Sequence, residues 1–147
     1  MTSSTTHEGF SISTERERLD VDAIHAYLSR SYWAEGIPRE TVERSIEGSL
    51  CFGLFDPDGA QVGFARLITD RATFAYLCDV YVLEAQRGRG LGRWLIDTVA
   101  AHPDLAGLRR MVLVTRDAHA LYAPVGFTPL KAPERFMEIV RPDLYCR

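Results

Sequence analysis

Apolar residues in the first third of the chain recur at helical spacing in two stretches. Residues 21–28 carry apolar side chains three and four positions apart, behind Asp20 or Asp22 as the capping residue. A second helix is predicted to begin at Pro38, because proline suits the first helical turn and apolar positions continue beyond it. The connection between the two helices, residues 31–36, contains two adjacent aromatic residues.

Alternating apolar positions predict strands, because side chains along a strand point to opposite faces in turn. A short strand is expected over residues 10–13, before the helices. Residues 50–54 and 62–68 alternate on either side of the turn 56–59, which favours a β-hairpin. A strand over residues 73–82 completes four antiparallel strands.

An amphipathic helix is predicted over residues 90–102, ending before Pro103. The continuous apolar run 111–114 that follows is typical of a central strand covered on both faces. Because a helix connects them, this strand should run parallel to the one that ends at Val82. The expected fold is therefore α/β, a mixed sheet of four antiparallel strands and a parallel fifth, with helices on both faces.

The remaining segments are expected to belong to the same single domain, residues 1–147. A short helix is predicted from residue 118 to about 124, with end strands near Phe127 and over 137–140. The first eight residues are rich in serine and threonine and are expected to form a flexible tail.

Composition narrows the classes of function. With 46% hydrophobic and 25% charged residues among 147, the chain has the composition of one soluble globular domain. A formal net charge of -3 argues against a nucleic-acid partner, because binding many phosphates needs a basic face. The three cysteines form no C-x-x-C pair and the four histidines show no zinc spacing, so no metal is expected. Without an export signal or an apolar run long enough for a membrane, a cytoplasmic location is expected.

The most informative segment is a glycine-rich turn between the strand ending at Val82 and the following helix. Its residues are Arg87, Gly88, Arg89, Gly90, Leu91, Gly92 and Arg93. Glycines let a backbone approach a ligand closely, and the free N–H groups at a helix start attract an anion. Neither a G-x-G-x-x-G fingerprint nor a P-loop is present. The turn is predicted to bind phosphate; the alternative, solvated arginines on an ordinary turn, is disfavoured by the flanking strand and helix.

This turn resembles the signature R/Q-x-x-G-x-G/A of the GCN5-related N-acetyltransferase family, which residues 87–92 match completely. The resemblance spans about residues 10 to 130. It implies that acetyl-coenzyme A binds with its pyrophosphate on the amides of residues 87–93. Its pantetheine arm would then bind the main chain of Val80, Tyr81 and Val82. Glu84 departs from the pattern, in which many members have proline.

A second family pattern, L/F-Y-x-x-x-G-F, is matched by residues 121–127. By this resemblance Tyr122 is expected to protonate the departing thiolate, since a phenol is a suitable donor. The alternative is that Tyr122 only packs beneath Phe127. Thr115 stands where many members have an asparagine that contacts the cofactor.

Asp79 is the candidate base that removes a proton from the acceptor amine, because a carboxylate rarely interrupts an apolar strand without cause. The alternative is that Asp79 only bonds a neighbouring loop. His25 and His119 are other candidate bases. Cys78 is not expected to carry the acetyl group, because alternation should point it to the face opposite Asp79.

Tyr32 and Trp33 could line an acceptor pocket or simply close the core, and the sequence leaves both open. Arg66 and Arg116 are expected to be solvated or paired rather than to bind substrate.

The function expected from these residues is direct acetyl transfer from acetyl-coenzyme A to an amine of a small molecule or a peptide. The main alternative is a non-catalytic module on the same fold that senses acyl-coenzyme A. A toxin acting on aminoacyl-tRNA would need a basic RNA-binding face, which the net charge disfavours. No sequence pattern identifies the acceptor, because one fold serves many different substrates. The sequence also leaves open whether the protein forms a homodimer.

Overall fold

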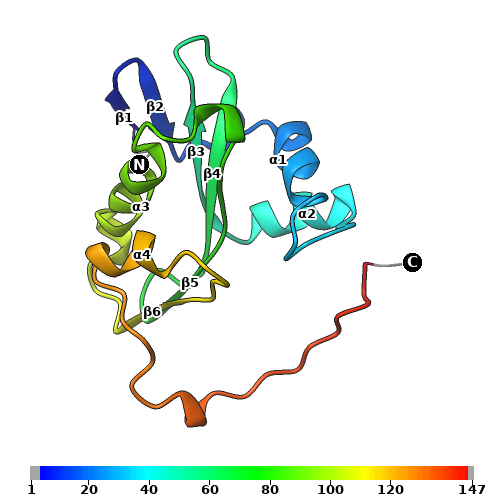
Figure 1. Ribbon diagram of the computed structural model, residues 1–147, viewed down its shortest axis with the longest axis vertical. Coiled ribbons are helices and arrows are strands. Elements are labelled where there is room, and N and C mark those ends of the chain that lie inside the picture. The colour runs from blue at the N-terminus through cyan, green and yellow to red at the C-terminus, as the bar shows by residue number, and fades with distance from the viewer. Residues whose placement is uncertain (1–3, 146–147) are drawn as a thin grey trace.

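The computed structural model describes residues 4–145, whose strands form one six-stranded sheet in the order β1-β2-β3-β4-β5-β6 (Figure 1). Neighbouring strands are antiparallel except β5 and β6, which are parallel. The predicted mixed sheet, with a parallel strand reached through a helix, is confirmed. The strands are β1 (Ser4–His7), β2 (Phe10–Ser13), β3 (Leu50–Phe55), β4 (Gln61–Thr69), β5 (Phe74–Val82) and β6 (Arg110–Leu113).

Helices cover both faces of this sheet, as predicted (Figure 1). On one face lie α1 (Val21–Leu28) and α2 (Arg39–Glu47), and on the other lie α3 (Leu91–Ala100) and α4 (His119–Tyr122). Each face has its own apolar core, because the strands present alternate side chains to the two sides. The larger core is centred on fully buried side chains such as Phe52, Leu54, Leu67, Leu95 and Ile96.

Helix starts follow from local hydrogen bonding. Asp20 is the cap of α1, since its Oδ1 accepts the N–H of Ala23 at 3.0 Å. Asp22, the other candidate cap, instead accepts a hydrogen bond from Arg39 of α2 at 2.6 Å. The polar sides of α1 and α2 are thereby joined while their apolar sides face the sheet.

The flexible tail predicted for the first eight residues is wrong from residue 4 onward. β1 pairs with β2 from Ser4↔Ser13 to His7↔Phe10. Glu8 and Gly9 both have positive φ, 50° and 85°, as in the type I′ turn whose twist suits a two-residue hairpin. Glu-Gly is not one of the usual residue pairs for this turn, so the hairpin could not be read from the pattern. Residues 1–3 lie outside the described part of the chain.

The end strands predicted near Phe127 and over 137–140 do not form within the described residues. The N–H of Phe127 is hydrogen-bonded to the carbonyl of Tyr122 at 3.4 Å, which closes a turn after α4. Residues 128–145, here called the C-terminal arm, then run in a wide arc away from the sheet (Figure 1). Proline at positions 129 and 133 removes N–H donors at the start of the arm, which hinders pairing there.

Candidate active site

The candidate site lies where β5 and β6 part. The two strands pair only from Phe74↔Arg110 to Leu77↔Leu113. Beyond this point a cleft of about 970 Å³ opens, lined by residues 78–82 on one side and 113–118 on the other. Its volume lies within the range of roughly 300 to 1,000 Å³ that is usual for ligand sites.

A β-bulge in β5 lies next to the cleft. The β4–β5 register steps from Arg66↔Cys78 to Phe64↔Tyr81, which places one β4 residue opposite two on β5. Asp79, one of those two, has a φ of 54°, a left-handed conformation that aspartate tolerates better than most residues. The bulge bends the strand and also breaks alternation. The Asp79 carboxylate reaches Arg66, the cross-strand partner of Cys78, so the expectation that Cys78 and Asp79 point to opposite faces is wrong.

The glycine-rich turn forms one end of the cleft. Gly88 and Gly90 have positive φ, 85° and 76°, and a Cβ at either position would meet no heavy atom within 4 Å. Gly90 is the N-cap of α3 and, among the described residues, no side chain caps it. The first N–H groups of a helix have no partner inside it, so this end of the cleft offers donors and a positive dipole end. The open space beside them fits a phosphate group.

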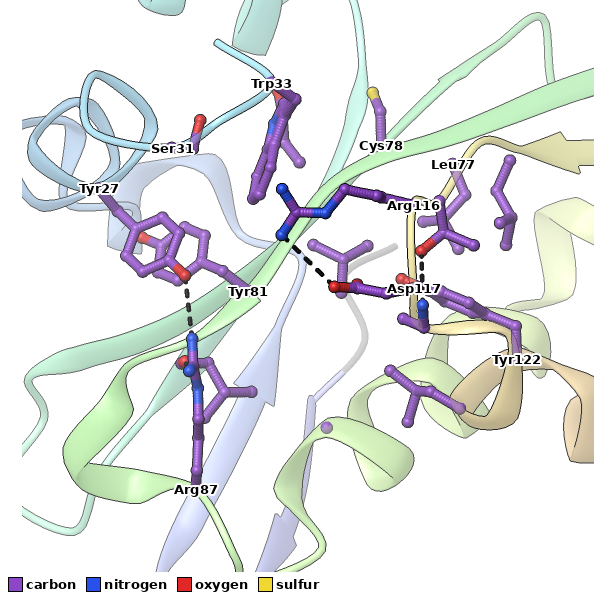
Figure 2. Close-up of a pocket in the computed structure, with 18 of the residues that line it drawn as sticks. Tyr27, Ser31, Trp33, Leu77, Cys78, Tyr81, Arg87, Arg116, Asp117 and Tyr122 are labelled. Atoms are coloured by element: carbon purple, nitrogen blue, oxygen red, sulfur yellow. Dashed lines mark hydrogen bonds and ion pairs between the residues drawn. The ribbon is translucent and has the colours of Figure 1, made fainter. Parts of the chain in front are cut away.

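Two arginines of the turn, Arg87 and Arg93, line the cleft and also contact the protein. The third, Arg89, is not among the residues that line the cleft, and its guanidinium lies 5.9 Å from the centroid of the Phe10 ring. Arg87 donates from Nη2 to the hydroxyl of Tyr27 at 3.1 Å (Figure 2). Its Nε donates to the carbonyl of Val82, also at 3.1 Å. Arg93 pairs with Asp97 one helical turn later, at 3.0 Å. Arg87 therefore fixes the shape of the turn, and Arg93 adds charge beside the helix start.

Further contacts brace the strand before the turn. Tyr81 is buried and stacks on Tyr27, with ring centroids 3.9 Å apart and planes inclined by 6°. Glu84, which departs from the family pattern, accepts two hydrogen bonds from Arg30 at 2.9 and 3.0 Å. These bonds lower the pKa of Glu84 to about 2. The departure thus leaves the turn anchored through an ion pair to the segment that follows α1.

Tyr122 lies across the cleft from this strand, on the short helix α4 (Figure 2). Its side chain is 8% exposed, and its ring meets Phe127 edge to face at 5.9 Å. Burial, and then the nearby Tyr32, raise the pKa of Tyr122 to about 12, so the hydroxyl keeps its proton at neutral pH. Thr115 shapes the turn before α4, because its Oγ1 accepts the N–H of Ala118 at 3.0 Å.

Asp79 faces the loop between α1 and α2. Its Oδ1 accepts a hydrogen bond from the indole Nε1 of Trp33, and its Oδ2 accepts one from Nε of Arg66, both at 2.8 Å. Arg66 also donates to Ser49 Oγ at 3.0 Å. The side chains of Asp79 and Arg66 are 9% and 14% exposed, so this is a largely buried ion pair. Arg66 is therefore paired, as predicted.

Aromatic side chains form the mouth of the cleft on the α1–α2 side. Tyr32 and Trp33 line it and are 55% and 40% exposed, so they do not close the core. Their rings meet edge to face at 5.1 Å. The guanidinium of Arg116 lies over Tyr32 at 3.9 Å and pairs with Asp117 at 3.4 Å, which bridges the two walls of the cleft.

The two candidate histidines lie outside the residues that line the cleft. His25 Nε2 is within 3.0 Å of the carbonyl of Ile37 and ties α1 to the following loop. His119 is on α4, three positions before Tyr122. Asp79 is thus the candidate base that the structure brings into the cleft together with Tyr122.

Two residues of the cleft escaped the sequence interpretation. Tyr27 lies within the first predicted helix but was not singled out there, although its hydroxyl accepts a hydrogen bond from Arg87. Gln86 has a buried Oε1 with no hydrogen-bond partner among the described residues, and it lines the cleft. A buried acceptor without a donor is costly, so a ligand N–H or hydroxyl in the cleft would stabilise it. No local pattern marks a single glutamine or tyrosine in this way.

Residues 4–145 bear on two further features, a metal site and a membrane span. No group of three or more histidine, cysteine or acidic side chains in this part of the chain is arranged to hold a metal ion. None of the helices described there combines the length and the apolar character that a bilayer crossing requires.

Comparison with known proteins identifies the family to which the chain belongs. Residues 17–127 match the model of the acetyltransferase (GNAT) family. A candidate acetyltransferase from Gibberella zeae is 35% identical over 137 residues, which cover 80% of this chain and 77% of that protein.

Solved structures show the same fold. A crystal structure of a candidate GNAT acetyltransferase from Xanthomonas campestris is 52% identical, with a TM-score of 0.91, over 97% of this chain and 99% of that one. This coverage takes in most of the C-terminal arm. Glucosamine-6-phosphate N-acetyltransferase from Arabidopsis thaliana is 12% identical, with a TM-score of 0.59 over 96% of this chain and 97% of that one. At that identity the likeness concerns the fold alone.

Proposed function

Because the chain belongs to the acetyltransferase (GNAT) family, we propose that it transfers the acetyl group of acetyl-coenzyme A directly to a primary amine. The acceptor would be a small molecule or a peptide, and residues 1–147 would act as one catalytic domain. The observation that carries this proposal is one cleft lined by the glycine-rich turn at the start of α3, by the buried Tyr122 and by the largely buried Asp79 carboxylate.

The cleft fits acetyl-coenzyme A at two points. The helix start at Gly90 and the open space over Gly88 suit the pyrophosphate. Val80 and Val82 line the cleft beyond the bulge, where their main chain can bind the pantetheine arm, and Gln86 offers a buried acceptor. When bound, acetyl-coenzyme A supplies an activated thioester.

Tyr122 and Asp79 divide the proton transfers. Amide formation requires a neutral amine, and deprotonating an alkylammonium with a pKa near 10.4 costs about 4 to 5 kcal/mol at pH 7. Asp79 takes this proton, directly or through water, on a lone pair that Trp33 and Arg66 leave free. As the carbon–sulfur bond breaks, the hydroxyl of Tyr122 donates its proton to the sulfur.

The mouth of the cleft is suited to the acceptor. Tyr32 and Trp33 present aromatic surface at the mouth, and Trp33 is tied to the proposed base. An amine bound against these rings would approach the cleft from the side of Asp79. Aromatic faces also attract ammonium groups, which favours an amine as the acceptor.

A non-catalytic sensor of acyl-coenzyme A would need the turn but not Tyr122 and Asp79. The decisive experiment is a panel of primary amines and peptides, assayed by release of free thiol from acetyl-coenzyme A. We expect turnover with at least one acceptor class and its loss in Tyr122→Phe. Tight binding of acetyl-coenzyme A with no turnover across the panel would favour the sensor.

We also propose a cytoplasmic location, which suits cysteines without a C-x-x-C pair.

A further inference from the structure

Arg116 is the arginine of the cleft whose hydrogen-bonding groups are least occupied. Its Nη2 donates to Asp117 at 3.4 Å, and its other N–H groups form no hydrogen bond with the residues that the structure describes. The two side chains are 63% and 68% exposed, and an ion pair this exposed contributes little stability. Arg30, by contrast, donates to both oxygens of Glu84, at 2.9 and 3.0 Å. Arg116 can therefore bind an anion without losing a strong partner.

An aromatic ring orients the Arg116 guanidinium within the cleft. Its Cζ lies 3.9 Å from the centroid of the Tyr32 ring, which belongs to the opposite wall. Figure 2 shows the Arg116 side chain extended into the cleft. A guanidinium that stacks on a ring keeps N–H groups along its edge, where they can form paired hydrogen bonds with a carboxylate. The stacked position thus suits Arg116 to a planar anion.

A continuous row of contacts links Arg116 to the proposed base. The Tyr32 ring, which Arg116 covers, meets the Trp33 ring edge to face at 5.1 Å. The Trp33 indole in turn donates to Asp79 at 2.8 Å. Burial, and then Tyr32, raise the pKa of Tyr122, so Tyr32 also lies near the proposed acid. The aromatic pair therefore lies between a cation at one end and the proposed base at the other.

Resting on the function proposed above, we propose that the acceptor is a small primary amine that also carries a carboxylate, and that Arg116 binds this carboxylate. The amine then lies at the Asp79 end of the aromatic pair, and the carbon chain packs on Tyr32 and Trp33, which are 55% and 40% exposed. A carboxylate suits the site better than a phosphate, because Asp117 beside Arg116 repels a second negative charge. The sequence alone favoured a solvated or paired Arg116.

Matched acceptors test the carboxylate. Amino acids, both α and ω, would be compared with the amines in which hydrogen replaces the carboxylate, by release of thiol from acetyl-coenzyme A. We expect at least one amino acid to have a KM roughly 10- to 100-fold below that of its matched amine, as hydrogen bonds to charged groups provide. Phosphate monoesters of amino alcohols should be poorer acceptors. Equal KM values throughout, or a preference for the phosphate esters, would overturn the proposal.

Variants assign the preference to Arg116. Arg116→Gln should reduce the ratio of kcat/KM between the amino acid and its matched amine by roughly 10- to 100-fold, chiefly through the KM of the amino acid. Arg116→Lys keeps the charge without the planar fork and should reduce the ratio less. Arg109→Gln is the control, since Arg109 is exposed, lies outside the cleft and carries the same charge. An equal loss with both acceptors would assign Arg116 to the structure of the mouth and overturn the proposal.

Failure of this inference is distinguishable from failure of the proposed function. Turnover of plain amines and amino acids alike, with a ratio that Arg116→Gln leaves unaltered, would reject the carboxylate site alone. No turnover with any amine would reject the proposed function. The coenzyme A complex of Trp94→Phe, in which Trp33 is the remaining tryptophan, would then be titrated with the amino acids and followed by fluorescence. Binding that Arg116→Gln weakens supports the site, and binding that it leaves unchanged, or no binding, overturns it.

Discussion

At the scale of single residues, the proposed base is held from two sides. Each oxygen of the Asp79 carboxylate already accepts one hydrogen bond, from Trp33 or from Arg66. A carboxylate oxygen has two lone pairs, so each retains one for a proton or a water. This arrangement fixes the direction in which Asp79 can act and links it to the α1–α2 loop at the mouth of the cleft.

We expect Asp79→Asn to lower turnover most at neutral pH and progressively less as pH approaches the pKa of the acceptor amine. Above that pKa the acceptor is already neutral and needs no base. The measurement is kcat against pH together with the dissociation constant of acetyl-coenzyme A, which should not change. An equal loss at every pH would assign Asp79 to positioning instead.

A matched variant is needed because Asp79→Asn also leaves Arg66 largely buried without its counter-charge. Breaking such a pair costs about 3 to 5 kcal/mol of stability when it is fully buried. Arg66→Gln breaks the same pair and keeps the carboxylate. We expect it to lower the melting temperature as much as Asp79→Asn while retaining far more turnover at neutral pH.

Tyr122→Phe should lower kcat by roughly 10² to 10⁴ with little change in cofactor binding, as for other positioned acids. The hydroxyl is removed while the buried ring and its contact with Phe127 remain, so the fold should survive. Tyr76→Phe is the control, since Tyr76 also lines the cleft on β5 and should tolerate the change. Turnover of Tyr122→Phe within a few-fold of the parent would return Tyr122 to a packing role.

At the scale of elements, the glycine-rich turn could be predicted because its requirements are local. Positive φ at Gly88 and Gly90 and the start of α3 follow from glycines placed just before an amphipathic helix. The bulge in β5 could not be predicted in this way. Residues 76–82 read as an ordinary strand, and the left-handed φ of Asp79 is stabilised by Arg66 and Trp33, which are distant in sequence.

The turn also provides a test that separates binding from folding. Gly90→Glu places a charged side chain in the open space beside the helix start, and we expect the affinity for acetyl-coenzyme A to fall by about 100-fold or more, or about 2.7 kcal/mol. Gly59→Glu is the matched control, with a φ of 90° and equally open space in the β3–β4 turn. Both variants should lose about 1 kcal/mol of stability, because residues with a Cβ are strained at such φ values.

Calorimetry with acetyl-coenzyme A gives both affinities. Equal affinity in the two folded variants would reject the turn as the phosphate site, whereas loss in Gly90→Glu alone supports it.

At the scale of the whole molecule, the two helical layers enclose ionisable groups that the proposed chemistry does not use. Burial raises the pKa of Cys51 to about 12, opposed by Arg66 and Arg16, and raises the pKa of Cys78 to about 12. The pKa of Tyr81 is also raised, by burial and then by Tyr27. These groups are buried because the strands carry side chains on both faces of the sheet and helices cover each face. The alternating apolar positions in the sequence of β3 to β5 predicted this two-sided burial in outline.

These raised pKa values predict a loss of stability in alkali. A group whose folded pKa is raised contributes stability that is complete below its unfolded pKa and disappears as pH rises towards the folded value. For Cys51, 6% exposed, this window runs from the ordinary thiol pKa of 9.0 to a folded pKa of about 12. Above pH 9 the group should remove about 1.4 kcal/mol of unfolding free energy per pH unit, or about 2 kcal/mol by pH 10.5.

The test is denaturant unfolding of the parent protein and Cys51→Ala between pH 8 and pH 10.5. Cys51→Ala should be less stable at pH 8, because a buried side chain is truncated, but its stability should fall less steeply with pH. Val62→Ala is the control, since Val62 is 4% exposed and cannot ionise. It should lower stability by a similar amount at every pH and leave the slope of the parent unchanged. Parallel curves for all three proteins would show that the Cys51 thiol does not contribute to the alkaline transition.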